Sequence, residues 1–326
     1  MTVDQRNTFN LTMIPGLILS GLMAFLLCSS GLFSILSPMP LVTAGIRYGK
    51  QMLYPLGVLT LIVTYFLFKG KDGSFFLIGM LCLYVVISFL ICEIIDRKIS
   101  PAKGMIGAGL LTLLISFGSI FAFLSDKGKT PKEFFVDKVV ANQKSYSSMV
   151  GLFYEKDSLE YKSFVQKIEK EPGVFADEVI PVIPKVLIVL SFITVWINLC
   201  LGFKNRFLRG SRREELEKLI NFKVPDHFVW LFIAGLGFVV FGEYLGAVVP
   251  EVGSYILTVL SIFYFFQGFG IYVSFLDSLK VFGFFRMLLI VSTVYMAFQI
   301  LILIGFTDLF VNFRRFFKKN NNEGEL

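Results

Sequence analysis

Long apolar runs recur along the whole chain, and short polar junctions separate them. A run of about 20 apolar residues is the length that a transmembrane helix requires. Eight runs approach this length: 11–36, 52–68, 74–95, 104–124, 182–202, 228–249, 253–276 and 284–306. The pattern predicts an all-α, polytopic transmembrane helical bundle with about eight spans.

One stretch breaks this pattern at the end of the first run. "SPMPLVTAGIRYGK" covers residues 37–50, with Pro38 and Pro40 at one end and Arg47 and Lys50 at the other. The apolar residues between them are too few to cross a bilayer as a full helix. The residues alone leave three interpretations: a loop, a half-helix that lines a site, or a turn.

A polar insert, residues 125–180, lies between two of the runs. "TPKE" places Thr130 as an N-cap, Pro131 at the first helical position and Glu133 three residues after the cap, which is a capping-box pattern. A second helix is expected over 158–170. The insert is either a solvated helical hairpin that joins two halves or a cap that docks a partner.

Composition and charge support a membrane protein and suggest its orientation. Hydrophobic residues make up 55% of the chain, which includes 38 phenylalanines, and the net charge of +7 is concentrated in a few junctions. Short loops rich in Lys and Arg stay on the cytoplasmic side. The junctions at 47–50, 97–103 and 203–223 are therefore expected inside, and the insert outside.

The longest basic junction, 203–223, is expected to form an amphipathic helix on the cytoplasmic leaflet. It carries the arginines that we expect to face lipid headgroups or a protein partner: Arg206, Arg209, Arg212 and Arg213. The basic tail after residue 310 also looks cytoplasmic, yet three spans after 203–223 would place it outside. There are three alternatives. One of the last three runs does not cross the membrane, the tail is basic although it lies outside, or the tail lies flat on the membrane–water interface.

These features divide the chain into four parts. We expect an N-terminal membrane half (1–124), the insert (125–180), a C-terminal membrane half (181–310) and a basic polar tail (311–326). The expected location is the bacterial cytoplasmic membrane, with membrane lipids as partners. No basic surface with interleaved aromatic residues suggests a nucleic acid as a partner.

The chain carries no constellation typical of catalysis. It has no HExxH, GxSxG or P-loop motif, its four cysteines show no CxxC spacing, and His227 has no second histidine to join it. We therefore expect no enzymatic activity, no cofactor and no metal. Ionisable residues at membrane depth are the functional candidates instead: Arg47, Glu93, Glu243, Asp277 and Asp308.

Gln267 is the strongest single candidate, because it lies near the middle of the span "SIFYFFQGFGIYVSF" beside Gly268 and Gly270. A mid-membrane amide needs a hydrogen-bond partner, and the glycines allow a close approach of another backbone. The Gln267 side chain either forms a hydrogen bond between helices or contacts a substrate. Substrate-binding candidates are thus Gln267, Gly268, Arg47 and Pro40, with Asp308 as an alternative partner for Arg47.

Several stretches together resemble the YybS-like family of bacterial polytopic membrane proteins. They are "SPMPLVTAGIRYGK", "DRKISPAKGMIGAGLL", "FKVPDHFVW", "FYFFQGFGIYVSF" and "GFTDLFVNFRRF". The N-terminal half also resembles, more distantly, the substrate-binding membrane components of energy-coupling-factor vitamin transporters, and MreD. That resemblance implies that residues 37–40 form an outer loop, 41–48 a half-helix and 47–50 a cytoplasmic turn, with the first helix ending near Ser34.

Two functions remain after these observations. The first is binding or transport of a small molecule or lipid through a cavity in the bundle, at a site shared by the half-helix and Gln267. The second is a non-transporting membrane scaffold, similar to MreD, that docks an envelope or signalling protein through its basic loop.

Overall fold

The computed structural model describes residues 11–69, 74–151, 154–155, 157–205, 213–246 and 248–315. The described residues that lie in regular structure are all helical, in agreement with the predicted fold class. The chain forms two compact units, one of residues 1–112 and 189–326 and the other of residues 113–188.

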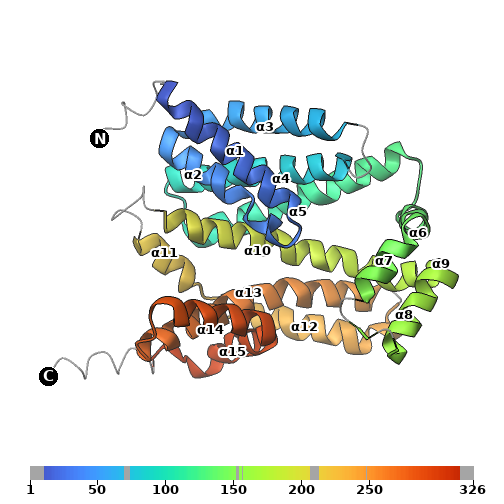
Figure 1. Ribbon diagram of the computed structural model, residues 1–326. Coiled ribbons are helices and arrows are strands. Elements are labelled where there is room, and N and C mark those ends of the chain that lie inside the picture. Colours follow the sequence, from blue (N-terminus) through green and yellow to red (C-terminus); the bar gives the residue numbers. More distant parts are fainter. Residues whose placement is uncertain are drawn as a thin grey trace. The chain divides into compact units, whose positions relative to one another are not determined.

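Helices from both ends of the chain build the first unit (Figure 1). Its N-terminal part contains η2 (Leu11–Met13), α1 (Ile14–Ser29), η3 (Leu32–Leu36), α2 (Pro38–Tyr48), η4 (Lys50–Met52), α3 (Leu53–Phe68), α4 (Ser74–Asp96) and the start of α5 (Pro101–Asp126). Its C-terminal part contains most of α10 (Ile183–Phe203), α11 (Arg213–Ile220), α12 (Phe228–Phe241), η7 (Gly242–Tyr244), α13 (Val249–Ser278), α14 (Gly283–Met296) and α15 (Phe298–Val311).

The second unit contains the polar insert and the helix ends that flank it. Its elements are the end of α5, α6 (Pro131–Ala141), α7 (Gln143–Val150), α8 (Leu159–Lys170), α9 (Pro172–Val179), η5 (Ile180–Val182) and the first residues of α10. The predicted capping box is confirmed: Glu133 N–H donates to Thr130 Oγ1 (3.2 Å), and Thr130 N–H donates to Glu133 Oε2 (2.8 Å). These bonds to Thr130 hold the pKa of the Glu133 carboxyl below its ordinary value. The predicted second helix is α8.

The number of spans differs from the eight that the apolar runs suggest. Among the described residues, five helices are long and apolar enough to cross a membrane, and α14 and α15 add a sixth span if their bent pair counts as one. The other two runs form α1, of 16 residues, and α12, of 14 residues. Such helices are about 24 Å and 21 Å long, less than the hydrocarbon thickness of about 30 Å. An expected count of eight full spans is therefore not confirmed.

The half-helix is present, but it begins earlier than expected. Its helix α2 starts at Pro38, so the residues "SPMP" enter the helix and do not form an outer loop. Pro38 and Pro40 fall in the first turn, where backbone N–H groups have no partner within the helix and a proline costs little. The first helix ends at Ser29 and not near Ser34, and a 3₁₀ turn over Leu32–Leu36 connects the two helices.

Three helices of the first unit run in the same direction and end together. Cys92 Sγ contacts Val42 O on α2 (3.8 Å), and Ser88 Oγ donates to Pro38 O (3.1 Å), so α2 and α4 are parallel. Asn198 Nδ2 donates to Ile35 O (2.7 Å) and Asn205 Nδ2 donates to Thr43 Oγ1 (3.1 Å), so α10 runs the same way. The basic junctions after these three helices therefore lie at one end of the unit.

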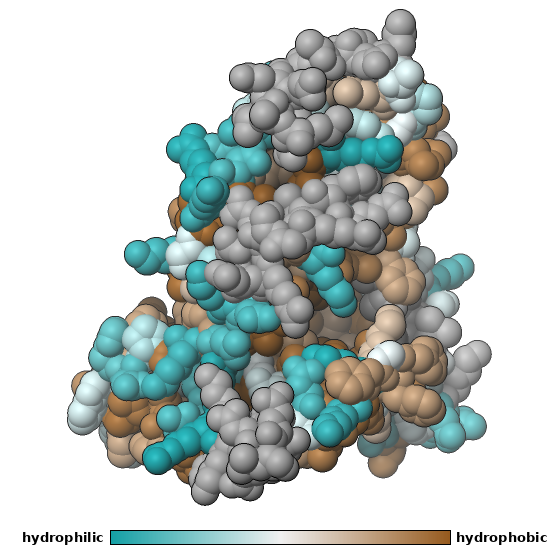
Figure 2. Space-filling model, turned by 90° about the vertical axis from the view of Figure 1, so that its left-hand side faces the viewer, coloured by the Kyte–Doolittle hydropathy of each residue, from teal (hydrophilic) through white to brown (hydrophobic). Residues whose placement is uncertain are grey.

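This end faces the viewer in Figure 2, where hydrophilic side chains gather between apolar ones. Elsewhere many large apolar side chains remain exposed on helices, for example Phe66 (71%), Phe121 (76%) and Phe284 (74%). A soluble protein covers most such side chains, whereas a bilayer solvates them. The exposed side chains agree with a membrane-embedded protein.

The amphipathic helix predicted for 203–223 is present in part, as α11. Leu219 is fully buried in it and Lys218 is exposed, and the helix packs against α13. The apolar face is thus directed to the protein. Arg206, Arg209 and Arg212 lie outside the described residues, and Arg213 is the first residue of α11.

Candidate functional site

Two groups of buried polar side chains lie inside the first unit, and the first surrounds the break between α1 and α2. Ser37 Oγ donates to Ala24 O on α1 (2.7 Å), Ser88 Oγ on α4 donates to Pro38 O, and Asn198 Nδ2 on α10 donates to Ile35 O. All three side chains are fully buried. We call Ser37, Ser88 and Asn198 the half-helix cluster. The bond from Asn198 to Ile35 O satisfies a carbonyl in the break between the two helices, whereas Ala24 O and Pro38 O lie within α1 and α2.

The half-helix cluster lies well inside the apolar part of the unit. Ser88 is eight residues before the end of α4 at Asp96, which is about 12 Å along the helix axis. Because Ser88 contacts Pro38, the first turn of α2 lies at the same depth. Non-helical backbone at membrane depth is tolerated only where it is enclosed by protein or lines a cavity.

One polar atom of the half-helix cluster has no partner among the described residues. Asn198 Nδ2 donates to both Ile35 O and Thr194 O (2.8 Å), which fixes the orientation of the amide. Asn198 Oδ1 then has no hydrogen-bond partner, although the side chain is fully buried. A buried acceptor without a partner is costly, by about 1–3 kcal/mol, and calls for an explanation such as a bound donor.

The second group lies where α13 and α15 meet at two glycines. A Cβ built on Gly268 would be 1.8 Å from Leu301 O, and one built on Gly305 would be 1.9 Å from Tyr264 O. Only glycine allows the two backbones to approach this closely. The contact brings Gln267 on α13 next to Asp308 on α15.

Gln267 uses both ends of its amide in this second group. Its Nε2 donates to Asp308 Oδ2 (2.9 Å), and its Oε1 accepts from the backbone N–H of Val224 (2.8 Å). Gln267 is fully buried and Asp308 is 3% exposed. These bonds connect α13, α15 and the segment before α12. Gln267 therefore forms a hydrogen bond between helices, which was one of its two predicted roles. Its contact to a substrate stays a prediction.

Arg314 completes this group just beyond the end of α15. Its guanidinium donates to Asn221 O (2.7 Å) and Phe222 O (2.9 Å), and Phe313 N–H donates to Asp308 Oδ1 (2.8 Å). Burial lowers the pKa of the Arg314 guanidinium, and the charge of Asp308 acts in the opposite direction. We call Gln267, Asp308 and Arg314 the α13–α15 cluster. It places the start of the basic tail beside the end of the 203–223 junction.

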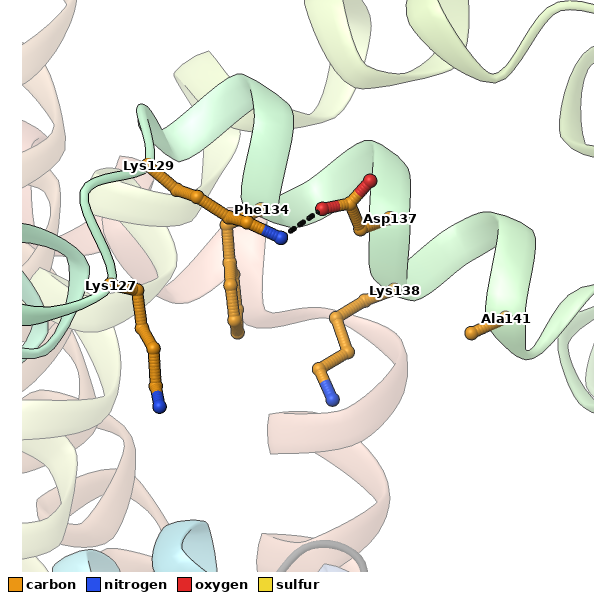
Figure 3. Close-up of a pocket in the computed structure, with 6 residues that line it drawn as sticks. All are labelled: Lys127, Lys129, Phe134, Asp137, Lys138 and Ala141. Atoms are coloured by element: carbon orange, nitrogen blue, oxygen red, sulfur yellow. Dashed lines mark hydrogen bonds and ion pairs between the residues drawn. The ribbon is translucent and has the colours of Figure 1, made fainter.

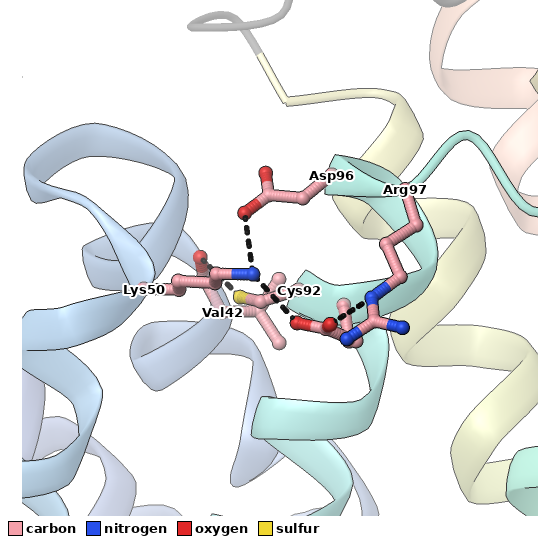
Figure 4. Close-up of polar contacts among 6 residues, drawn as sticks. Val42, Lys50, Cys92, Asp96 and Arg97 are labelled. Carbon is pink, nitrogen blue, oxygen red and sulfur yellow. Dashed lines mark hydrogen bonds and ion pairs between the residues drawn. The ribbon is translucent and has the colours of Figure 1, made fainter. Parts of the chain in front are cut away.

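A third polar group, at the end shared by α2 and α4, consists of charged side chains (Figure 4). Lys50 Nζ lies 2.8 Å from Glu93 Oε2 and 3.9 Å from Asp96 Oδ2, and Arg97 pairs with Glu93 one helical turn away. Glu93 is only 17% exposed, whereas Arg97 is 70% exposed. The group joins the first two basic junctions, so these lie on the same side, as their charge predicts.

The structure does not bring all the predicted site residues together. Pro40 lies in the first turn of α2 near the half-helix cluster, whereas Gln267 and Gly268 belong to the α13–α15 cluster. Helix α10 lies between the two clusters, because Asn198 contacts Ile35 while Trp196 stacks on Phe266 of α13 (ring centroids 4.9 Å apart).

Arg47 lies in the last turn of α2, with its guanidinium 5.0 Å from the centre of the Tyr48 ring. The carboxylate of Asp308 bonds to Gln267 and Phe313 instead of Arg47.

The sequence did not point to several residues of these clusters. Asp308 was identified as an ionisable residue at membrane depth and as a possible partner of Arg47, and its bond to Gln267 joins positions 41 residues apart. Asn198 lies in an otherwise apolar span, where a neutral amide is a signal that could have been given more weight. Ser37 and Ser88 carry no such signal, because serines are common where membrane helices pack.

Comparisons with known proteins add one finding. No curated protein and no solved structure matches the chain. Residues 16–309 match the family described as "Predicted membrane protein (DUF2232)". The match covers most of the chain, including every side chain of the half-helix cluster and of the α13–α15 cluster except Arg314. The chain therefore belongs to the DUF2232 family of predicted membrane proteins.

Proposed function

We propose that this protein binds, and as a transporter moves, a small uncharged molecule or a lipid headgroup at the half-helix cluster. The observation that carries the proposal is Asn198 Oδ1, which is fully buried beside an interrupted helix and has no partner within the described part of the chain. Interrupted helices mark the binding sites of many transporters, because their open backbone groups contact the substrate. The distant resemblance of the N-terminal half to vitamin-binding transport components supports the same function.

The chemistry of the cluster suggests the class of ligand. Its side chains are two serine hydroxyls and one amide, and their hydrogen bonds go to backbone carbonyls of Ala24, Ile35 and Pro38. Asn198 Oδ1 accepts, so its ligand must donate a hydrogen bond. A charged ligand would lack a counter-ion in these bonds and would be costly at this depth. The ligand is therefore neutral and carries a hydroxyl or an amide donor.

Native mass spectrometry of the gently purified full chain tests this function. We expect an adduct of fixed mass on the wild type and its loss in Asn198→Ala, because the substitution removes the free acceptor. The matched control is Ser191→Ala, which removes a buried hydroxyl elsewhere on α10. This variant is expected to keep the adduct. Thermal unfolding of each variant shows whether it is folded.

The opposite results are equally informative. If folded Asn198→Ala keeps the adduct, or if the wild type carries only water at Asn198 in a high-resolution structure, the ligand site is not at the half-helix cluster. A single stoichiometric protein partner in place of an adduct would favour the second function.

That second function is a membrane scaffold of an envelope or signalling complex. One observation favours it: the 203–223 junction and the start of the basic tail lie side by side, joined by Arg314 and the carbonyls of Asn221 and Phe222. Together they provide a basic surface for an acidic protein segment. On this proposal Arg206, Arg209, Arg212 and Arg213 contact the partner or anionic lipid.

The proposed topology places this basic end in the cytoplasm of a bacterial cell and the insert outside. In a chain whose native cysteines are replaced, we expect Ser145→Cys in α7 to react with an impermeant maleimide in intact spheroplasts. Lys218→Cys and Arg315→Cys are expected to react only after lysis, because Arg314 holds the tail beside the junction that carries Lys218. Labelling of Lys218→Cys and Arg315→Cys from different sides would contradict the structure itself.

A further inference from the structure

A hollow of about 290 Å³ lies in the second unit, directly after the end of α5 (Figure 3). The residues that line it are Lys127, Lys129, Phe134, Asp137, Lys138 and Ala141. It is formed by the turn between α5 and α6 and by one face of α6. Phe134 packs edge-on against Phe123 of α5 (ring centroids 5.4 Å apart), which fixes the ring in the wall of the hollow.

The charges around this hollow do not balance. Lys129 Nζ pairs with Asp137 Oδ2 at 2.5 Å. Lys127 and Lys138 make no ion pair with the described side chains, and Figure 3 shows both chains extending to the same side of the hollow, on either side of Phe134. Lys138 Nζ lies 5.8 Å from the centre of the Phe134 ring. Two ammonium groups that have no ion pair among the described residues thus flank an apolar ring.

The position of the hollow along the chain suggests what fills it. Helix α5 has 26 residues, or about 39 Å, which exceeds the hydrocarbon core of about 30 Å. Its exposed phenylalanine at 121 is suited to contact with acyl chains, and Lys127 follows six residues later. Lysines close to a membrane surface attract anionic lipid headgroups. A phosphate group there would find two ammonium donors and an adjacent apolar surface.

We propose that the hollow between α5 and α6 binds a phosphate-bearing anion through Lys127 and Lys138, with Phe134 as the apolar wall. The phosphate belongs to the headgroup of an anionic membrane lipid or to a soluble phosphate compound. This site is independent of the half-helix cluster and of the function proposed for it. Lys129 remains bonded to Asp137, so this pair adds no net charge at the rim.

A reporter at the rim tests this site in the full-length, detergent-solubilised protein. Ala141 is exposed and lines the hollow, so Ala141→Cys can carry an environment-sensitive fluorophore after replacement of the native cysteines. Short-chain phosphatidylglycerol below its micelle concentration is titrated, with short-chain phosphatidylcholine and inorganic phosphate in parallel. We expect saturable binding of phosphatidylglycerol, weakened roughly tenfold or more in Lys127→Gln/Lys138→Gln.

The control pair Lys144→Gln/Lys162→Gln removes two exposed lysines of the same unit outside the hollow and is expected to leave the affinity unchanged. Saturation by inorganic phosphate, weakened by the same double variant, would support the site and assign it to soluble phosphate. The proposal is overturned if no ligand gives a saturable change. It is also overturned if the double variant at Lys127 and Lys138 binds as tightly as the parent protein.

Discussion

Gly268→Ala is expected to prevent α13 and α15 from packing and to destabilise the protein by about 3 kcal/mol or more. The new Cβ would lie 1.8 Å from Leu301 O and 2.9 Å from Gly305 N. Both are backbone atoms, so no side-chain rotation relieves the clash and the two helices must move apart. Such a movement would also break the bond between Gln267 and Asp308. The measurement is the midpoint of thermal unfolding in detergent.

A glycine in open space provides the matched control. Gly237 lies on α12, the other neighbour of α13, and a Cβ built there meets nothing within 4 Å. Gly237→Ala should leave the unfolding midpoint unchanged or raise it slightly, since alanine favours a helix. Gly305→Ala should behave like Gly268→Ala, because its Cβ would be 1.9 Å from Tyr264 O. Equal midpoints for all three variants would show that α13 and α15 do not meet at these glycines.

Much of the architecture could be predicted from the hydrophobic pattern. The helical class, the membrane location and the interruption after the first run follow from run lengths and from Pro38 and Pro40. The helical insert with its capping box at Thr130 follows from local residue types, because a cap is decided within one turn. These features depend on neighbours in sequence, which is the information that a single sequence contains.

The last apolar run shows where such reasoning ends. Residues 284–306 read as one continuous span, yet α14 and α15 are bent by 92° at Ala297. No proline or glycine stands at 297, so nothing local marks the bend. After the bend, α15 packs on α13 through Gly268 and Gly305, a contact between distant segments of the chain. Beyond the bend, the tail begins beside Asn221 and Phe222.

The polar clusters were predictable only as single residues. Gln267 was recognised because an amide in the middle of an aromatic-rich span is conspicuous. Its partners Asp308 and Val224 come from segments that reach it only after folding. Asn198 is a polar residue in an apolar run, but its contact to Ile35 depends on the position of the 3₁₀ turn. Periodicity and charge identify residues that need partners, whereas tertiary packing decides which partners they obtain.

Gln267→Leu is the second substitution for which we expect a large effect. Leucine fills a similar volume but cannot bond, so the N–H of Val224 and one oxygen of Asp308 lose their partners. A buried polar group without a partner costs about 1–3 kcal/mol, and more when it is charged. We therefore expect a lower midpoint of thermal unfolding and less folded protein in the membrane. Asp308→Asn, which keeps an acceptor oxygen but removes the charge, is expected to have a smaller effect.

The control for this substitution is Gln299→Leu, which makes the same change at an exposed amide of α15. It should leave stability unchanged, because its amide is not buried. In the double variant Gln267→Leu/Asp308→Asn the losses should be less than additive, since both substitutions change the same contact between Gln267 and Asp308. Suppose instead that Gln267→Leu unfolds at the wild-type midpoint and loses the adduct seen by native mass spectrometry. Gln267 would then contact the ligand, and the half-helix cluster would not be the whole binding site.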